Sequence, residues 1–230
     1  MIKKPSDTAL LKGHRNRMRE KIMAHGHHAL REDEILEMLL FHAIPRRDVK
    51  PLSKQLIKKF GSLERVIFAP PEKLETIDGV KLTTIAFFQL LQRLRVDFKK
   101  AEFEGKTILS NWQSVIDFCR AEIGFEEKEI FAALFLNASN TYIDYIRLST
   151  GTVDKVSIYP REILEKAIAL KAKAVILAHN HPGGNPTPSK QDIAMTRQIN
   201  DSLETVNISL HDHLIITEQS HSSFKSLGLI

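Results

Sequence analysis

One short segment constrains the fold of this 230-residue chain more than any other. Residues 175–178 form an apolar run that is followed by a segment rich in proline and glycine, which is typical of a buried strand ending in a turn. His179 and His181 lie two positions apart at the end of this run. Because side chains alternate along a strand, both imidazoles are expected on one side. Ser189 is then predicted to cap a helix, with Asp192 in its first turn.

Two imidazoles and one carboxylate supply three metal ligands and leave a fourth tetrahedral position open for water, as in a catalytic zinc site. The sequence therefore predicts that His179, His181 and Asp192 bind one Zn²⁺ ion. The alternative is a capping box, since Ser189 and Asp192 have the spacing of one. Capping alone leaves two histidines at strand spacing unexplained, so metal binding is favoured.

These residues resemble a known motif. The order His-x-His-Pro followed by Ser-x-x-Asp matches the JAMM motif of the MPN (JAB-type) metallopeptidases, and residues 178–196 are similar to the bacterial RadC branch. Residues 159–163 and 212–216 are also RadC-like, and the resemblance covers residues 12–230. It implies a zinc-dependent metallohydrolase, a peptidase or isopeptidase that cleaves a peptide or isopeptide substrate with a metal-activated water.

The resemblance also implies a glutamate on an early strand that takes a proton from the water. Alignment on the shared residues 151–152 places this glutamate near Tyr145 and Ile146, where the chain has none. Asp144 is the nearest carboxylate, so we expect it either to replace the glutamate as the base or to leave the protein catalytically weakened. The motif serine, Ser189, is expected to hydrogen-bond the developing oxyanion, a role that competes with capping for the same hydroxyl.

The composition is that of an ordinary globular protein, with 43% hydrophobic and 27% charged residues. No run approaches the roughly 20 apolar residues of a membrane helix, and the first residues lack the apolar core of a signal peptide. Cys119 is the single cysteine, which excludes an intrachain disulfide and the paired cysteine ligands of a nucleobase deaminase. We therefore expect a cytoplasmic protein without a membrane partner.

Charge divides the chain into two parts. Residues 1–104 contain 21 Lys and Arg against 14 Asp and Glu, whereas residues 105–230 contain 12 against 14. This asymmetry predicts two domains with different roles. We expect a mobile tail at residues 1–11, a basic helical domain at residues 12–104 and the metal-binding domain at residues 105–230.

The helical domain supports an alternative function. Its segment around Gly79 resembles half of a helix-hairpin-helix, whose glycine turn presents backbone N–H groups to a phosphate, although Lys81 replaces the usual second glycine. Four basic residues on the first predicted helix either contact phosphates or form a solvated face: Arg15, Arg17, Arg19 and Lys21. The alternative is thus a DNA-associated or repair-linked accessory protein that binds DNA through residues 12–104 and has a residual or non-catalytic metal site. An inactive scaffold is a third possibility.

The second half alternates strands and helices. Apolar segments predict strands at residues 130–136, 142–148, 175–178 and 214–217, and amphipathic segments predict helices at 112–122, 161–170 and 189–203. The chain is therefore expected to be α+β, with a helical domain followed by a mixed sheet between helices. The resemblance implies the same α/β/α arrangement, that of the MPN (cytidine-deaminase-like) fold. His213, which precedes an apolar strand, is expected to support the site rather than to bind the metal.

Overall fold

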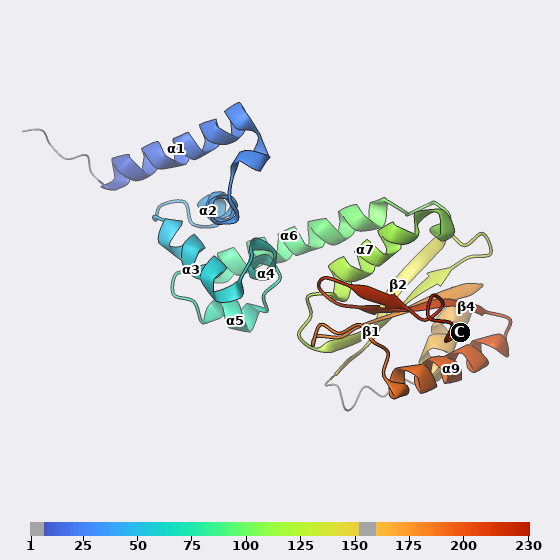
Figure 1. The fold of residues 1–230 in the computed structure, drawn as a ribbon. Helices are drawn as coiled ribbons and strands as arrows, with labels where there is room; N and C mark the ends of the chain where they lie inside the picture. Colours follow the sequence, from blue (N-terminus) through green and yellow to red (C-terminus); the bar gives the residue numbers. More distant parts are fainter. Residues whose placement is uncertain (1–6, 152–159) are drawn as a thin grey trace, which may run out of the picture. The chain divides into compact units, whose positions relative to one another are not determined.

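The computed structural model describes residues 7–151 and 160–230 (Figure 1). The chain divides into two compact units, Met1–Arg93 and Leu94–Ile230. The first unit is helical, and the second contains a sheet with helices on both faces. This architecture confirms the predicted α+β class.

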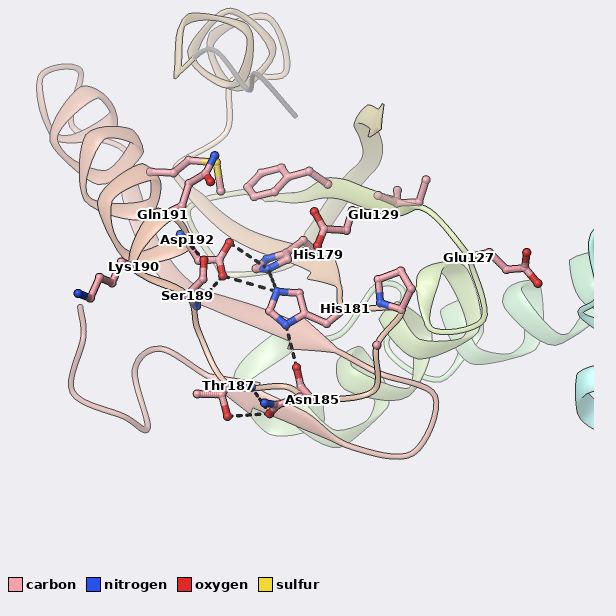
Figure 2. Close-up of a pocket in the computed structure, with 15 residues that line it drawn as sticks. Glu127, Glu129, His179, His181, Asn185, Thr187, Ser189, Lys190, Gln191 and Asp192 are labelled. Carbon is pink, nitrogen blue, oxygen red and sulfur yellow. Dashed lines mark hydrogen bonds and ion pairs between the residues drawn. The ribbon is translucent and has the colours of Figure 1, made fainter. Parts of the chain in front are cut away.

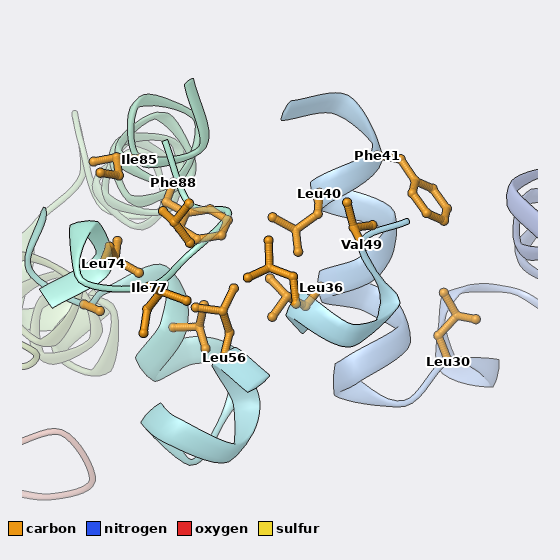
Figure 3. Close-up of a cluster of buried hydrophobic side chains, with 14 of the residues drawn as sticks. Leu30, Leu36, Leu40, Phe41, Val49, Leu56, Leu74, Ile77, Ile85 and Phe88 are labelled. Carbon is orange, nitrogen blue, oxygen red and sulfur yellow. The ribbon is translucent and has the colours of Figure 1, made fainter. Parts of the chain in front are cut away.

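The helical unit is built from short amphipathic helices around one core. Its elements are α1 (Asp7–His25), the 3-10 turn η1 (His27–Ala29), α2 (Glu32–Ala43), α3 (Lys50–Phe60), α4 (Leu63–Ile67), α5 (Pro71–Glu75) and the first part of α6 (Leu82–Ala101). Leu36 and Leu40 lie one turn apart on α2 and are fully buried with Leu56 and Phe88 (Figure 3). Gly61 ends α3 with φ +95°, a conformation that favours glycine.

The basic residues of α1 have structural partners within the helical unit. The guanidinium of Arg15 donates hydrogen bonds to the carbonyl oxygens of Ile44 and Arg47, both at 2.8 Å, and lies over the Phe41 ring. Lys21 pairs with Glu34 at 3.0 Å. These contacts stabilise the packing of α1 on the segment after it, and they account for Arg15 and Lys21 without a phosphate.

The second unit contains a mixed sheet of five strands within the described residues, in the order β2-β1-β3-β4-β5. The strands are β1 (Glu129–Leu136), β2 (Tyr142–Gly151), β3 (Ala174–Asn180), β4 (Ser209–Ile216) and β5 (His221–Ser223). β3 and β4 are parallel, and every other neighbouring pair is antiparallel. A parallel pair requires a crossover, which α9 (Lys190–Glu204) provides.

Helices cover both faces of this sheet, as the alternation of apolar side chains along β1 and β3 requires. Leu134 and Ile176 pack with α7 (Trp112–Ile123), which follows the 3-10 turn η2 (Ile108–Asn111). Phe135 and Leu177 pack on the opposite face, with α8 (Pro160–Ala169) and α9. The central strand β3 is therefore buried along its whole length, including His179 near its end.

The boundaries of the two units differ from those predicted. The division falls after Arg93, within α6, whereas a boundary near residue 105 was expected. The last turns of α6 belong to the second core, because Val96 packs against it and Phe103 is fully buried beside Phe118. The predicted tail is helical from Asp7, and residues 1–6 lie outside the described part of the chain. Among the described residues, we find no helix with the length and apolar character needed to traverse a lipid bilayer.

Candidate metal centre

The two histidines of the motif lie where β3 leaves the sheet. His179 is the penultimate residue of this strand and is almost fully buried, whereas His181 follows the strand and is half-buried. The backbone N–H of His181 still donates to Ile216 O at 2.9 Å, so the pairing with β4 continues one residue beyond β3. This extension keeps the two imidazoles on the same side, as the strand spacing predicts.

The side chains of His179, His181 and Asp192 converge on one point (Figure 2). Nε2 of His179 lies 3.0 Å from Nε2 of His181. The two oxygens of Asp192 approach these atoms, with Oδ1 at 3.4 Å from His179 and Oδ2 at 3.5 Å from His181. The structure thus brings together the three residues predicted as metal ligands, although they come from a strand, a turn and a helix.

Asp192 takes part in a capping box at the same time. Its Oδ2 accepts a hydrogen bond from Ser189 N at 2.7 Å, and its backbone N–H donates to Ser189 Oγ at 3.1 Å. Capping was considered as an alternative to metal binding. In the structure the two are compatible, because the capping box directs the Asp192 carboxylate toward the histidines. Ser189 Oγ is the acceptor in this box, and a side-chain hydrogen bond from Ser189 also contributes to the low pKa of Asp192. Ser189 is therefore bound to the carboxylate that it was expected to accompany.

Burial and hydrogen bonds set the charges of the three groups. Burial lowers the pKa of His179 to about 4, so its imidazole is neutral at pH 7. Burial alone would raise the pKa of Asp192, but hydrogen bonds with His181 and Ser189 outweigh it and hold the pKa well below its usual range. The hydrogen bond with Asp192 raises the pKa of His181. The centre therefore combines an ionised carboxylate with a neutral imidazole.

A second layer of polar groups lies behind His179. His213, on β4, is fully buried, and its Nε2 lies 2.8 Å from Nδ1 of His179. Its Nδ1 lies 2.6 Å from Oγ1 of Thr196, on α9. This position agrees with the expectation that His213 supports the site. Nδ1 of His181 instead lies 2.8 Å from the backbone oxygen of Asn185.

The three residues line a pocket of about 640 Å³ that also contains two glutamates, Glu127 and Glu129. Glu129 is the first residue of β1, and its carboxylate is near enough to His181 to contribute to the raised pKa of that residue. Figure 2 shows Glu129 beside His179, whereas Glu127 lies farther from the histidines and points away from them. A carboxylate therefore faces the candidate centre without being part of the converging group.

The position of Asp144 does not support its predicted role as the base. Asp144 pairs with Phe135 on β1, whereas His179 pairs with Phe131, four residues earlier. Four residues of strand correspond to about 13 Å. Asp144 Oδ1 accepts a hydrogen bond from the N–H of Tyr145, and Asp144 is not among the described residues that line the pocket.

Glu129 is the pocket residue that the sequence analysis missed. The segment 130–136 was predicted as a strand, but its neighbour in the sheet was not predicted. Because β1 runs antiparallel to β3, the start of β1 lies beside the end of β3, where the histidines are. An acidic residue directly before that strand was the available signal.

Comparison with known proteins gives matches over nearly the whole chain. Residues 109–229 match the family described as RadC-like JAB domain, and residues 13–86 match the family described as UPF0758 N-terminal. A UPF0758 protein of Fusobacterium nucleatum is 44% identical over 225 residues, which cover 95% of this chain and 97% of the relative. A UPF0758 protein of Ruegeria pomeroyi is 39% identical, with 96% and 98% covered. Another from Rhodobacter capsulatus is also 39% identical, with 93% and 100% covered.

Proposed function

Because the chain belongs to the family of RadC-like JAB-domain proteins, we propose that it is a zinc-dependent hydrolase of peptide or isopeptide bonds. The observation that carries the proposal is the convergence of His179, His181 and Asp192. Membership of the family alone is compatible with a residual, inactive centre, whereas three ligand groups held at one point are what a functional centre requires.

A metal ion would displace the proton of the His181–Asp192 hydrogen bond, and the converging atoms would then all be acceptors. Nδ1 of His181 faces the Asn185 carbonyl oxygen, which can only accept, so that nitrogen carries the proton of the neutral ring and Nε2 presents its lone pair. Lone pairs of imidazole and carboxylate groups at 3.0 to 3.5 Å repel one another unless a proton or a metal ion lies between them. The ligand atoms of a tetrahedral zinc site are separated by about 3.3 Å. The donor set and its spacing therefore fit Zn²⁺.

A bound zinc ion would act as a Lewis acid that activates water and polarises a substrate carbonyl. We assign the role of general base to Glu129. Its carboxylate lines the same cavity, and its negative charge contributes to the raised pKa of His181. It would accept a proton from the attacking water and return it to the leaving amine. Ser189 would donate its hydroxyl proton to the carbonyl oxygen as negative charge develops there.

An activity assay tests this proposal. Zinc-loaded protein would be incubated with two sets of fluorogenic substrates, linear peptides and peptides joined through a lysine ε-amine. We expect zinc-dependent cleavage in at least one set, together with loss of cleavage in Glu129→Gln. Absence of cleavage by the zinc-loaded protein in both sets would refute hydrolysis, even if zinc binds tightly.

A DNA-associated role is the second candidate, and the basic excess of the helical half supports it. Gly79 has φ +90°, and the exposed Lys81 lies two residues later, directly before α6. In the full-length protein, Lys81→Ala should weaken binding to duplex DNA and lower its salt dependence. Lys58→Ala, an exposed lysine on α3, is the matched control. Equal effects of both variants would indicate attraction by net charge only.

A further inference from the structure

The hydrogen bonds behind His179 form a chain whose direction is fixed at one end. Thr196 lies within α9, and its hydroxyl donates to the backbone oxygen of Asp192 at 2.6 Å. A carbonyl oxygen has no proton to give, so the single hydroxyl proton of Thr196 is used in this bond. Any other partner of Thr196 Oγ1 must therefore donate to it.

That other partner is His213. Its Nδ1 lies 2.6 Å from Thr196 Oγ1, so Nδ1 carries a proton and donates it. The ring is fully buried between Phe224, which stacks on it, and Phe131, which meets it edge-on. Such apolar surroundings favour the neutral ring. A neutral ring with a proton on Nδ1 has a lone pair on Nε2.

The tautomer of His179 follows from that of His213. Nε2 of His213 accepts, and Nδ1 of His179 lies 2.8 Å from it, so Nδ1 of His179 carries the proton. The lone pair of His179 is then on Nε2, the atom that faces His181 and Asp192. Each donor in this series of hydrogen bonds has one acceptor. The orientation of the Thr196 hydroxyl and the tautomers of His213 and His179 are therefore determined.

We propose that Thr196 and His213 are positioning residues that hold His179 as its Nδ1–H tautomer, so that the peptide oxygen of one metal ligand, Asp192, selects the ligating atom of another. The consequence for metal binding rests on the proposed function, whereas the tautomer itself does not. Histidine ligands usually donate their second N–H to a carboxylate, a carbonyl or a water. Here the acceptor is a neutral imidazole, which orients the ligand without adding negative charge to the centre.

The direct test is the tautomer of each histidine in the metal-free wild-type protein. Long-range ¹H–¹⁵N correlation spectra distinguish a protonated Nδ1 from a protonated Nε2, and His213→Gln and His179→Gln assign the signals. We expect Nδ1–H forms for both His179 and His213. An Nε2–H form, or an averaged mixture, at either residue would overturn the proposal.

Variants of Thr196 extend the test to the metal. Thr196→Val keeps the shape of the side chain and removes the acceptor for His213, so both tautomers should become mixed and zinc affinity should fall about 10- to 100-fold. Thr196→Ser retains the hydroxyl and should behave like the wild type. Thr205→Val, which loses a hydroxyl bonded to Ser202 O at the end of α9, is the matched control.

The outcomes separate the two claims. Fixed Nδ1–H tautomers in a protein that does not bind zinc would leave the hydrogen-bond chain intact and refute the metal centre. Tight zinc binding with unchanged tautomers and affinity in Thr196→Val would refute the positioning role and leave the metal centre standing.

Discussion

The side-chain oxygen of Asn180 lies 2.6 Å from the backbone nitrogen of Ile130 and accepts its hydrogen bond. The amide nitrogen of Asn180 donates to the backbone oxygens of Glu126 and Lys128, at 3.1 and 3.0 Å. Asn180 lies between the two histidines of the centre, and its side chain therefore holds the segment that carries Glu129. One residue couples the position of the proposed base to that of the proposed ligands.

Replacing Asn180 by alanine should separate hydrolysis from zinc binding. Three backbone groups lose their partner, so we expect a loss of about 1–3 kcal/mol in the free energy of unfolding. Hydrolysis should fall because Glu129 is less well held, while zinc affinity changes little. Urea unfolding, zinc titration and the peptide assay measure the three effects. Asn137→Ala, which removes hydrogen bonds from the β1–β2 turn, is the control and should leave hydrolysis unchanged.

Glu129→Gln should keep the fold and the zinc content and lower the rate of hydrolysis. Loss of a general base typically costs a factor of about 10² to 10⁴. Rate constants should be compared at equal zinc occupancy, measured by elemental analysis. A rate within threefold of the wild type would show that another group accepts the proton.

Asp144→Asn is the matched variant for the base that was predicted from the sequence. The carboxylate is remote from the histidines, and its Oδ1 accepts a hydrogen bond from the neighbouring Tyr145 N–H. We expect unchanged hydrolysis and a stability change within about 0.5 kcal/mol, as for an ordinary partly exposed site. A rate loss as large as that of Glu129→Gln would restore Asp144 as the base.

The two roles of Ser189 can be measured separately. Ser189→Ala removes the cap and should cost about 1 kcal/mol of stability, whereas Ser189→Gly costs only a few tenths at such a position. Both variants lack the hydroxyl. Equal losses of kcat, of about 10²-fold or more, would identify the hydroxyl as an oxyanion donor. If the loss of kcat is instead larger in the variant that loses more stability, Ser189 acts through the helix cap.

The local part of the site could be predicted from sequence because its geometry is short-range. The two-residue spacing of His179 and His181 on a strand, and the three-residue spacing of Ser189 and Asp192 at a helix start, determine their directions without further information. The α+β class followed from the same periodicities.

The proposed base could not be identified in this way, since its position depends on which strands are neighbours. Glu129 lines the pocket of the histidines because β1 pairs antiparallel with β3. The alignment used for Asp144 extended from residues 151–152 along β2, which is not a neighbour of β3. The division after Arg93 lies within α6, and periodicity does not indicate such a division because a continuous helix can take part in two cores.

Zinc content and affinity measured on the purified full-length protein test the central claim most directly. We expect one zinc per chain for the wild type and for His211→Ala, a control histidine bonded to Asn140 and outside the centre. We expect loss of zinc in His181→Ala and in Asp192→Asn, together with loss of the rise in melting temperature that zinc produces in the wild type. Equal zinc content and equal zinc-dependent stabilisation in all four proteins would contradict a metal centre formed by His179, His181 and Asp192.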